Sequence, residues 1–180
     1  MYEQQTVVTN RDVTARLVPS GTVTHIPKGS FVNICQALGG NYTVTFNGNM
    51  MRIDGMDADA IDQEAIQLHF EAPDPSGDVR EDEILDVLRT IYDPEIPVNI
   101  VDLGLIYNCD LVQAEGKNII HIRMTLTAPT CGMGPVIVGD IEYRLGKVPN
   151  VDKVEVDLVF DPPWTRDNLS EEAQIELGLF

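Results

Sequence analysis

The sequence has few basic residues, few cysteines and no long apolar run. Of its 180 residues, 12 are Lys or Arg against 29 Asp or Glu, so the formal net charge is −17. A surface of this sign repels polyanions, which excludes nonspecific binding to DNA, RNA or anionic lipid. No apolar stretch approaches the ~20 residues needed to span a bilayer, and the first residues are polar and acidic, unlike a secretory signal. We therefore expect a cytoplasmic protein without a membrane segment.

Cysteine is scarce, and the three present, Cys35, Cys109 and Cys131, are widely spaced without a CxxC pair. This pattern fits neither the disulfide framework of small secreted domains nor a four-thiolate metal site within one chain. The hydrophobic content of 43% nevertheless suffices for a buried core and separates the chain from acidic disordered sequences.

The first part of the chain reads as short strands separated by turn signals. The Asn47-Gly48 pair suits a two-residue hairpin turn, because both residues tolerate positive φ. Strands this short and tightly joined indicate a small antiparallel barrel or sandwich. Between residues 57 and 68, apolar residues recur every three or four positions, which is compatible with a helix. The predicted strands are 12–18, 22–26, 30–37, 42–46 and 50–53.

A break in the pattern divides the chain into two predicted domains. Residues 71–78 contain two prolines and one glycine, which is typical of a linker. We therefore expect a small β-rich domain at 1–75 and a second domain at 76–180.

The second domain alternates helical and strand patterns. Asp78 and Glu81 have the spacing of a capping box, which predicts a helix from Asp78 that ends at Pro94. We expect strands at 105–113 and 118–127 to form a hairpin, followed by a helix at 135–147. The last strand, at 151–160, should lie parallel to the strand at 118–127. The predicted fold class is α+β: the small β-rich domain is followed along the chain by a compact α-β-β-α-β domain. The apolar positions that we expect to face the core include Ile84, Leu85, Leu88, Ile91, Tyr92, Leu105, Tyr107, Cys109, Leu111, Val154, Val156, Leu158 and Phe160.

Cys131 is the candidate reactive thiol. Cys35 and Cys109 fall within strand patterns and are interpreted as small core hydrophobes, although Cys35 could instead face solvent. Cys131 lies between a predicted strand end and a predicted helix start, where the helix dipole lowers a thiol pKa and favours the thiolate. Gly132 and Gly134 would let a ligand approach the backbone. The structural alternative, in which these glycines shape a tight turn over Cys131, stays open.

Two further segments supply candidate groups. The loop after the first helix presents Asp93 and Glu95, either as capping groups or as ligands and acid/base groups beside Cys131; Asp102, next to Gly104, is assigned to a turn. Trp164, in the C-terminal tail, either clamps the tail to the core or anchors a partner protein.

The common signatures of catalysis are missing from the sequence. The histidines His25, His69 and His121 have no metal-ligand spacing, and no Ser/His/Asp constellation, phosphate-binding loop or dinucleotide fingerprint is present. Hydrolase, NTPase and dehydrogenase activities therefore have little support.

Three segments, 93–107, 126–135 and 161–178, together resemble the metal–sulfur cluster biosynthesis (PaaD-like) domain family. The N-terminal part is similar, at 23–29 and 57–61, to the bacterial SufT proteins of that family. The resemblance implies an auxiliary, non-enzymatic role in iron–sulfur cluster assembly or delivery to apo-enzymes.

Within this resemblance, Cys131 matches the family's reactive cysteine, and Asp93 and Glu95 match its acidic loop. The Cys-Gly-Met-Gly-Pro context departs from the simpler Cys-Pro form of other members.

One candidate thiolate per chain is too few to hold a cluster, which usually takes four thiolates. We therefore expect Cys131 to bind a cluster or iron transiently, with ligands completed by a second protomer, a client cysteine, glutathione or carboxylates. The expected partners are iron–sulfur assembly proteins and client apo-proteins, and a homodimer is left open. The alternative is a protein-binding scaffold of the same pathway in which Cys131 is structural.

Overall fold

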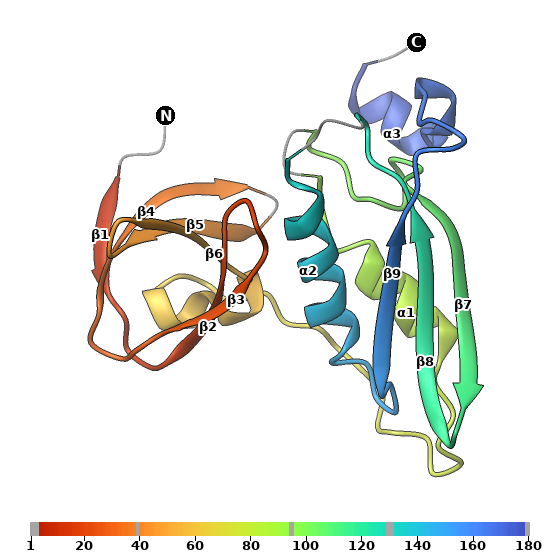
Figure 1. Ribbon diagram of the computed structural model, residues 1–180, viewed down its shortest axis with the longest axis horizontal. Helices are drawn as coiled ribbons and strands as arrows, with labels where there is room; N and C mark the ends of the chain where they lie inside the picture. The colour runs from red at the N-terminus through yellow and green to blue at the C-terminus, as the bar shows by residue number, and fades with distance from the viewer. Residues whose placement is uncertain (1–3, 39, 94–95, 129–131, 179–180) are drawn as a thin grey trace. The chain divides into compact units, whose positions relative to one another are not determined.

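The computed structural model describes residues 4–38, 40–93, 96–128 and 132–178. The chain divides into two compact units, Met1–His69 and Phe70–Phe180. Unit 1 is built on an antiparallel sheet of six strands, and unit 2 on a three-stranded sheet with helices (Figure 1). The α+β class predicted from the sequence is confirmed. None of the helices in the described ranges is long and apolar enough to cross a membrane.

The sheet of unit 1 has the strand order β1-β4-β5-β6-β2-β3, with every neighbouring pair antiparallel. The five predicted strands are β2 to β6, and Asn47 and Gly48 take the expected positive φ of 49° and 77° between β5 and β6. The short strand β1 was not predicted, because its Gln-Thr-Val-Val sequence gives one buried position. The bounds are β1 Gln5–Val8, β2 Val13–Leu17, β3 Val23–Ile26, β4 Phe31–Leu38, β5 Asn41–Phe46 and β6 Asn49–Ile53.

The alternation of apolar residues in these strands produces the core of unit 1. The inward positions of all six strands meet there and are almost completely buried, together with two residues of the short helical segment that follows β6. The principal members are Val13, Ala15, Ile26, Val32, Ile34, Val44, Met51, Ile53, Ala60 and Ile61.

The helix predicted at 57–68 is instead a single 3₁₀ helix, η1 (Gly55–Ile61). Its N-cap is Asp54, whose carboxylate accepts a hydrogen bond of 2.9 Å from the Met56 N–H. Asp62 ends it in the left-handed region with φ 58°. The apolar spacing was correct for the buried residues Ala58 and Ile61, but the dense Asp residues favour capping and turns over a longer helix.

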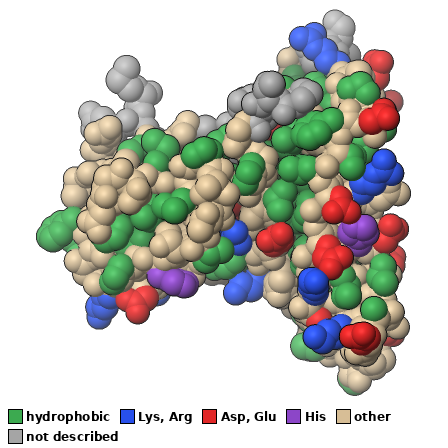
Figure 2. All heavy atoms as spheres, viewed as in Figure 1, with side chains coloured by type: hydrophobic (Ala, Val, Ile, Leu, Met, Phe, Trp, Pro, Cys, Tyr) green, Lys and Arg blue, Asp and Glu red, His purple; other side chains and the backbone are tan. Residues whose placement is uncertain are grey.

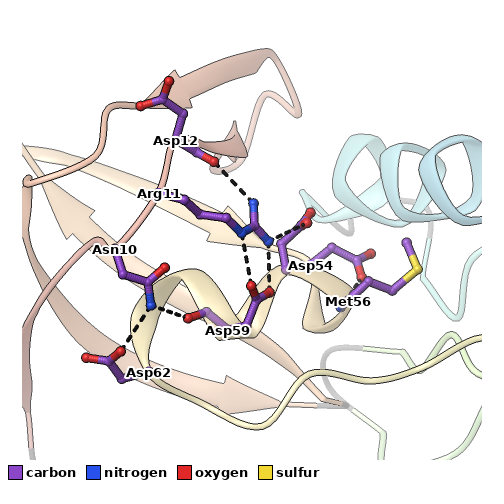
Figure 3. A network of polar contacts seen from close by, with 8 residues as sticks. Asn10, Arg11, Asp12, Asp54, Met56, Asp59 and Asp62 are labelled. Carbon is purple, nitrogen blue, oxygen red and sulfur yellow. Dashed lines mark hydrogen bonds and ion pairs between the residues drawn. The ribbon is translucent and has the colours of Figure 1, made fainter.

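Arg11 ties η1 to the loop between β1 and β2. Its guanidinium donates two hydrogen bonds to Asp59, of 3.0 Å from Nε and 2.8 Å from Nη2, and a third of 3.1 Å to Asp57 (Figure 3). Asn10 reinforces the contact through the Asp59 carbonyl and the Asp62 carboxylate. The hydrogen bond from Arg11 is the main reason that the pKa of Asp59 is lowered.

We expect Arg11→Gln to destabilise unit 1 by roughly 1 kcal/mol at neutral pH, because a forked but exposed ion pair is lost. Asp59 has a lowered folded pKa, so its stabilisation is present above the unfolded value of about 4 and is lost as the pH falls through the folded value. The difference between wild type and variant should therefore shrink below about pH 4. Hydrogen exchange of unit 1 amides measures it, with the exposed Lys28→Gln as charge-matched control. A pH-independent difference, or an equal loss in Lys28→Gln, contradicts this assignment.

Unit 2 has the predicted order α-β-β-α-β and ends in a tail. The strand β8 lies between an antiparallel neighbour, β7, and a parallel one, β9. The helices α1 and α2 cover one face of this sheet (Figure 1). The bounds are α1 Glu81–Leu88, β7 Ile106–Ala114, β8 Lys117–Met124, α2 Gly134–Leu145, β9 Lys153–Leu158, η2 Arg166–Asn168 and α3 Glu171–Glu176.

The predicted limits of α1 are wrong at both ends. The helix begins at Glu81, its N-cap residue Arg80 makes no side-chain cap, and the expected capping box of Asp78 does not form. The backbone of Asp78 is instead held by Asn150, which donates to its carbonyl at 2.9 Å. The helix ends at Leu88 and not at Pro94, because Ile91 leaves it to accept a hydrogen bond from the Ile100 N–H.

The predicted linker is attached to unit 2. Asn118 donates to the Gly77 carbonyl at 2.8 Å, Asn150 donates to the Asp74 carbonyl at 3.2 Å, and Arg80 donates to the Ala72 carbonyl at 2.7 Å. These side chains satisfy backbone oxygens that the irregular segment leaves unpaired. The segment therefore behaves structurally as the first part of unit 2.

Three positions that the pattern assigned to the core are exposed. Leu85 is 41% exposed and Phe160, which follows the end of β9, is 42% exposed. Cys109 is also exposed. It pairs with the buried Ile122 and so lies on the helix side of the sheet, but β7 is an edge strand and leaves it open to solvent.

Candidate functional site

The acidic loop between α1 and β7 is folded back on itself. Tyr92 and Asn99 form an isolated antiparallel bridge, and the Asp93 N–H donates to the Val98 carbonyl at 3.3 Å. Asp93 is 5% exposed, and its carboxylate accepts a hydrogen bond of 3.1 Å from the Ile96 N–H. The carboxylate of Asp93 thus helps to close the loop. Glu95, the second predicted acidic residue, lies outside the described residues.

The second half of this loop forms a tight turn around Asn99. Its side-chain oxygen accepts hydrogen bonds from the Val101 and Asp102 N–H groups, and its amide donates to the Asp102 carboxylate at 2.7 Å. Asp102 therefore shapes the turn, and the turn presents the carbonyls of residues 102–104 to the C-terminal tail.

The tail is fastened to these carbonyls. The Trp164 indole donates to the Leu103 carbonyl at 2.7 Å, and the Ser170 N–H donates to the Asp102 carbonyl at 2.8 Å. The Tyr107 hydroxyl donates to the Pro162 carbonyl at 2.5 Å. Half-buried Trp164 therefore clamps the tail against the acidic loop. Ser170 caps α3, as predicted, by accepting from the Ala173 N–H.

Gly104 allows the loop and the tail to approach at backbone distance. It has φ +76°, and a Cβ at this position would lie 2.1 Å from the Asn168 carbonyl oxygen. Any side chain would push the tail away, so glycine is required by both the conformation and the space.

The segment between β8 and α2 (residues 125–133), called the cysteine loop below, begins at the end of the sheet where the acidic loop meets the tail. Beyond the end of β8, the Thr125 N–H donates to the Leu105 carbonyl at 2.9 Å. The Thr125 hydroxyl is completely buried and has no hydrogen-bond partner among the described residues. The sequence analysis did not predict this group, because no local pattern reports whether a hydroxyl is buried without a partner. Such unpaired buried polar atoms are rare in proteins.

After the exposed Gly132, the chain enters α2 at Gly134. Gly134 is closely packed: a Cβ there would lie 3.0 Å from the Leu126 side chain and 3.4 Å from that of Leu158. Pro135 stands in the first turn of α2, as expected. Cys131 lies outside the described residues. The described parts of the acidic loop, the cysteine loop and the tail therefore lie at one end of unit 2, the upper end in Figure 1.

The solvent face of the three-stranded sheet carries charges of both signs (Figure 2). His121 on β8 lies 2.7 Å from the Asp157 carboxylate on β9, and Lys153 lies 2.9 Å from Glu155. His121 is thus on the polar face of its strand, as predicted. Within the described ranges, no group of three or more His, Cys, Asp or Glu side chains is arranged to hold a metal ion.

Cys109 opens into a groove of about 320 Å³ between α1 and β7. Although the residue is exposed as a whole, its surroundings in the groove are mainly apolar. Burial there raises the pKa of the Cys109 thiol, and the charges of Asp110 and Glu81 raise it further. The lining residues are Glu81, Asp82, Ile84, Leu85, Cys109 and Leu111.

Comparison with known proteins identifies the family. The family described as "Iron-sulfur cluster assembly protein" matches residues 81–158. The chain is 50% identical over 98 residues to the Fe-S protein maturation auxiliary factor of Porphyromonas gingivalis, a match that covers 54% of this chain and 90% of that protein. The chain belongs to the iron–sulfur cluster assembly protein family.

Two further relatives carry similar names. The Fe-S protein maturation auxiliary factor YitW of Bacillus subtilis is 42% identical over 96 residues, covering 53% of this chain and 91% of the relative. SufT of Staphylococcus aureus is 38% identical over 89 residues, covering 49% of this chain and 98% of the relative. The predicted family resemblance is confirmed, although each of these matches leaves about half of the present chain uncovered.

Gly104→Ala should loosen the tail. The strained φ alone costs about 1–2 kcal/mol, and the collision with Asn168 should add about 1–3 kcal/mol. Denaturation monitored by the fluorescence of Trp164, the single tryptophan, measures the loss, and the native emission should shift toward that of a solvated indole. Gly116→Ala is the matched control, because Gly116 has φ +75° and nothing within 4 Å of the added Cβ. Equal losses in the two variants would show that the contact with Asn168 is unimportant.

Cys109 should react slowly with iodoacetamide at neutral pH, since its raised pKa keeps the thiol protonated. The rate should rise with pH through a midpoint above that of an ordinary cysteine thiol. Glu81→Gln should lower the midpoint, because it removes one of the charges that oppose the thiolate. Mass spectrometry of the alkylated peptide follows the reaction in a Cys35→Ser, Cys131→Ser background. A midpoint at or below the ordinary value is the contrary result.

Proposed function

We propose that the protein is an auxiliary maturation factor that handles an iron–sulfur cluster, or iron, transiently at Cys131 and passes it to client apo-proteins. The observation that carries this proposal is the meeting, at one end of unit 2, of the three segments that resemble the family. Leu105 joins the start of the cysteine loop to the acidic loop, and Leu103 joins the acidic loop to the tail.

The chemistry of the site supports transient binding. Clusters are usually held by four thiolates, and Cys131 supplies one thiolate per chain. Cys109 lies in the separate groove between α1 and β7, so we do not assign it as a second ligand. The remaining ligands would come from Glu95, a client cysteine, glutathione or a second copy of the chain. A cargo held by so few ligands leaves readily, which suits a factor that delivers it.

Asp93 has a positioning role in this proposal. Its buried carboxylate accepts a hydrogen bond from the Ile96 N–H and so ties together the two described sides of the acidic loop. Trp164 connects the tail to the same loop, and because it is half-buried the indole keeps some surface with which a partner could make contact. We assign the protein no catalytic turnover, and we expect it to work in the cytoplasm with iron–sulfur assembly proteins and their clients.

Anaerobic reconstitution with iron and sulfide tests the role of Cys131. Wild-type protein should develop visible charge-transfer absorption, and Cys131→Ser should lose it and mature a cluster-dependent apo-enzyme at least about tenfold more slowly, because even second-shell changes cost metal sites 10–100-fold. Cys35→Ser and Cys109→Ser are the matched controls and should behave as wild type.

Three outcomes are distinguished by this experiment. Full maturation activity in Cys131→Ser removes the thiol from the mechanism. Absorption that persists in Cys131→Ser, together with unchanged client binding, favours the scaffold alternative. Equal loss in all three cysteine variants would indicate a general effect of oxidation or folding and would contradict a specific site.

A further inference from the structure

In the described part of the sheet, β7 is an edge strand with few of the features that usually protect one. It is nine residues long and has β8 as its neighbour on one side (Figure 1). Natural edge strands commonly carry Lys, Pro or bulges that prevent pairing with other chains. The sequence of β7, Ile-Tyr-Asn-Cys-Asp-Leu-Val-Gln-Ala, contains neither Lys nor Pro, and its register shift is confined to the start, between Ile106 and Asn108. The remainder of β7 is competent to pair with another strand.

The groove beside this edge contains side chains that are patterned for burial. Leu85 is 41% exposed, and Cys109 and Leu111 lie on the same side of the sheet as the buried Ile120 and Ile122, their partners on β8. In a sheet, alternate side chains point to the same face, and neighbouring strands lie ~4.8 Å apart. A strand added beyond β7 would therefore place every second side chain over Leu85 and Cys109 and complete the apolar layer.

The acidic charge around β7 indicates which kind of strand can pair with it. Glu81 and Asp82 line the groove, and Asp110 lies on β7 facing the other side of the sheet from Cys109. Pairing of β7 with β7 of a second copy would bring these carboxylates together in molecules that each carry a net charge of −17. A segment with Lys or Arg would instead neutralise Asp110 on the open face and would be attracted by the nearby charges of Glu81 and Asp82.

We infer that β7 and the adjoining groove form a docking site for an extended segment of a partner protein, which adds to the sheet as a strand. Its apolar side chains enter the groove against Ile84 and Leu85, and its alternating Lys or Arg side chains pair with Asp110 on the open face. Strand addition gives affinity through the backbone and selectivity through alternate side chains. The inference does not depend on the role of Cys131.

Binding of two labelled peptides tests this inference. Each probe has about ten residues, the length of a typical longer strand, with blocked ends; one alternates Val with Lys and the other Val with Glu. Fluorescence anisotropy of the full chain at low salt should show saturable binding of the Lys peptide, weakening as salt screens the charges, and at least about tenfold weaker binding of the Glu peptide. Hydrogen exchange should show new protection in β7.

Variants locate the site. Leu85→Lys, which places a positive charge in the groove, should weaken binding of the Lys peptide by about tenfold. Ile175→Lys is the control, because it makes the same charge change at a residue of α3 that is 60% exposed. Hydrogen exchange on wild type keeps the test valid even if Leu85→Lys alters folding.

Several results would overturn the inference. They are absence of saturable binding, equal binding of the two peptides, equal weakening by both variants, or protection outside β7. A dimer of the free protein in sedimentation that Leu85→Lys dissociates would assign the edge to a second copy of the chain instead.

Discussion

The arrangement of unit 2 depends on a backbone-to-backbone contact that only glycine permits. At Gly104 the loop turns with φ +76° directly against the carbonyl of Asn168, without room for a Cβ. That contact lets Leu103 accept the Trp164 indole and Asp102 accept the Ser170 N–H. The tail has little regular structure of its own, so these hydrogen bonds, together with the burial of Leu169 and Ala173, fix its position beside the acidic loop. The same loop then reaches the start of the cysteine segment through Leu105.

Irregular segments elsewhere in unit 2 are fixed by the same principle. Backbone groups outside helices and strands need partners when they are removed from water, and here polar side chains from distant parts of the chain supply them. Asn118 and Asn150 hold the linker, and the completely buried Arg144 donates from Nη1 to the carbonyl and the hydroxyl of Thr90 just after α1. The acidic loop therefore departs from a helix whose end is fixed by α2, and its geometry is set from both sides.

The sequence predicted those elements whose burial is periodic and failed where a single contact or an edge decides. The alternation of Ile120, Ile122 and Met124 predicted the central strand β8 correctly, because a strand with neighbours on both sides buries its inward side chains completely. Asp78 was expected to cap α1, but its carbonyl is held by an asparagine 72 positions away, which no local pattern contains. Cys109 carries the alternation of a core residue yet lies at an edge, and strand order is a property of the whole sheet.

The same distinction between local and long-range features holds for the candidate site. Residue type and position along the chain predicted Cys131, Asp93, Glu95 and Trp164 as candidate residues, because a thiol before a helix and prolines around an acid are local signals. The burial of Asp93, the hydrogen bond from Trp164 to Leu103 and the unpaired hydroxyl of Thr125 depend on segments that meet only in the folded chain.

This division has a physical consequence for a carrier. In the proposed role, a cargo bound by one thiolate per chain would be held weakly, so selectivity in its transfer would have to come from contacts between proteins. The strongly acidic surface attracts basic surfaces toward the molecule, and the partner strand proposed to dock along β7 would fix their orientation without adding a ligand. Weak binding of the cargo and specific binding of the partner can then be adjusted separately, since different residues supply them.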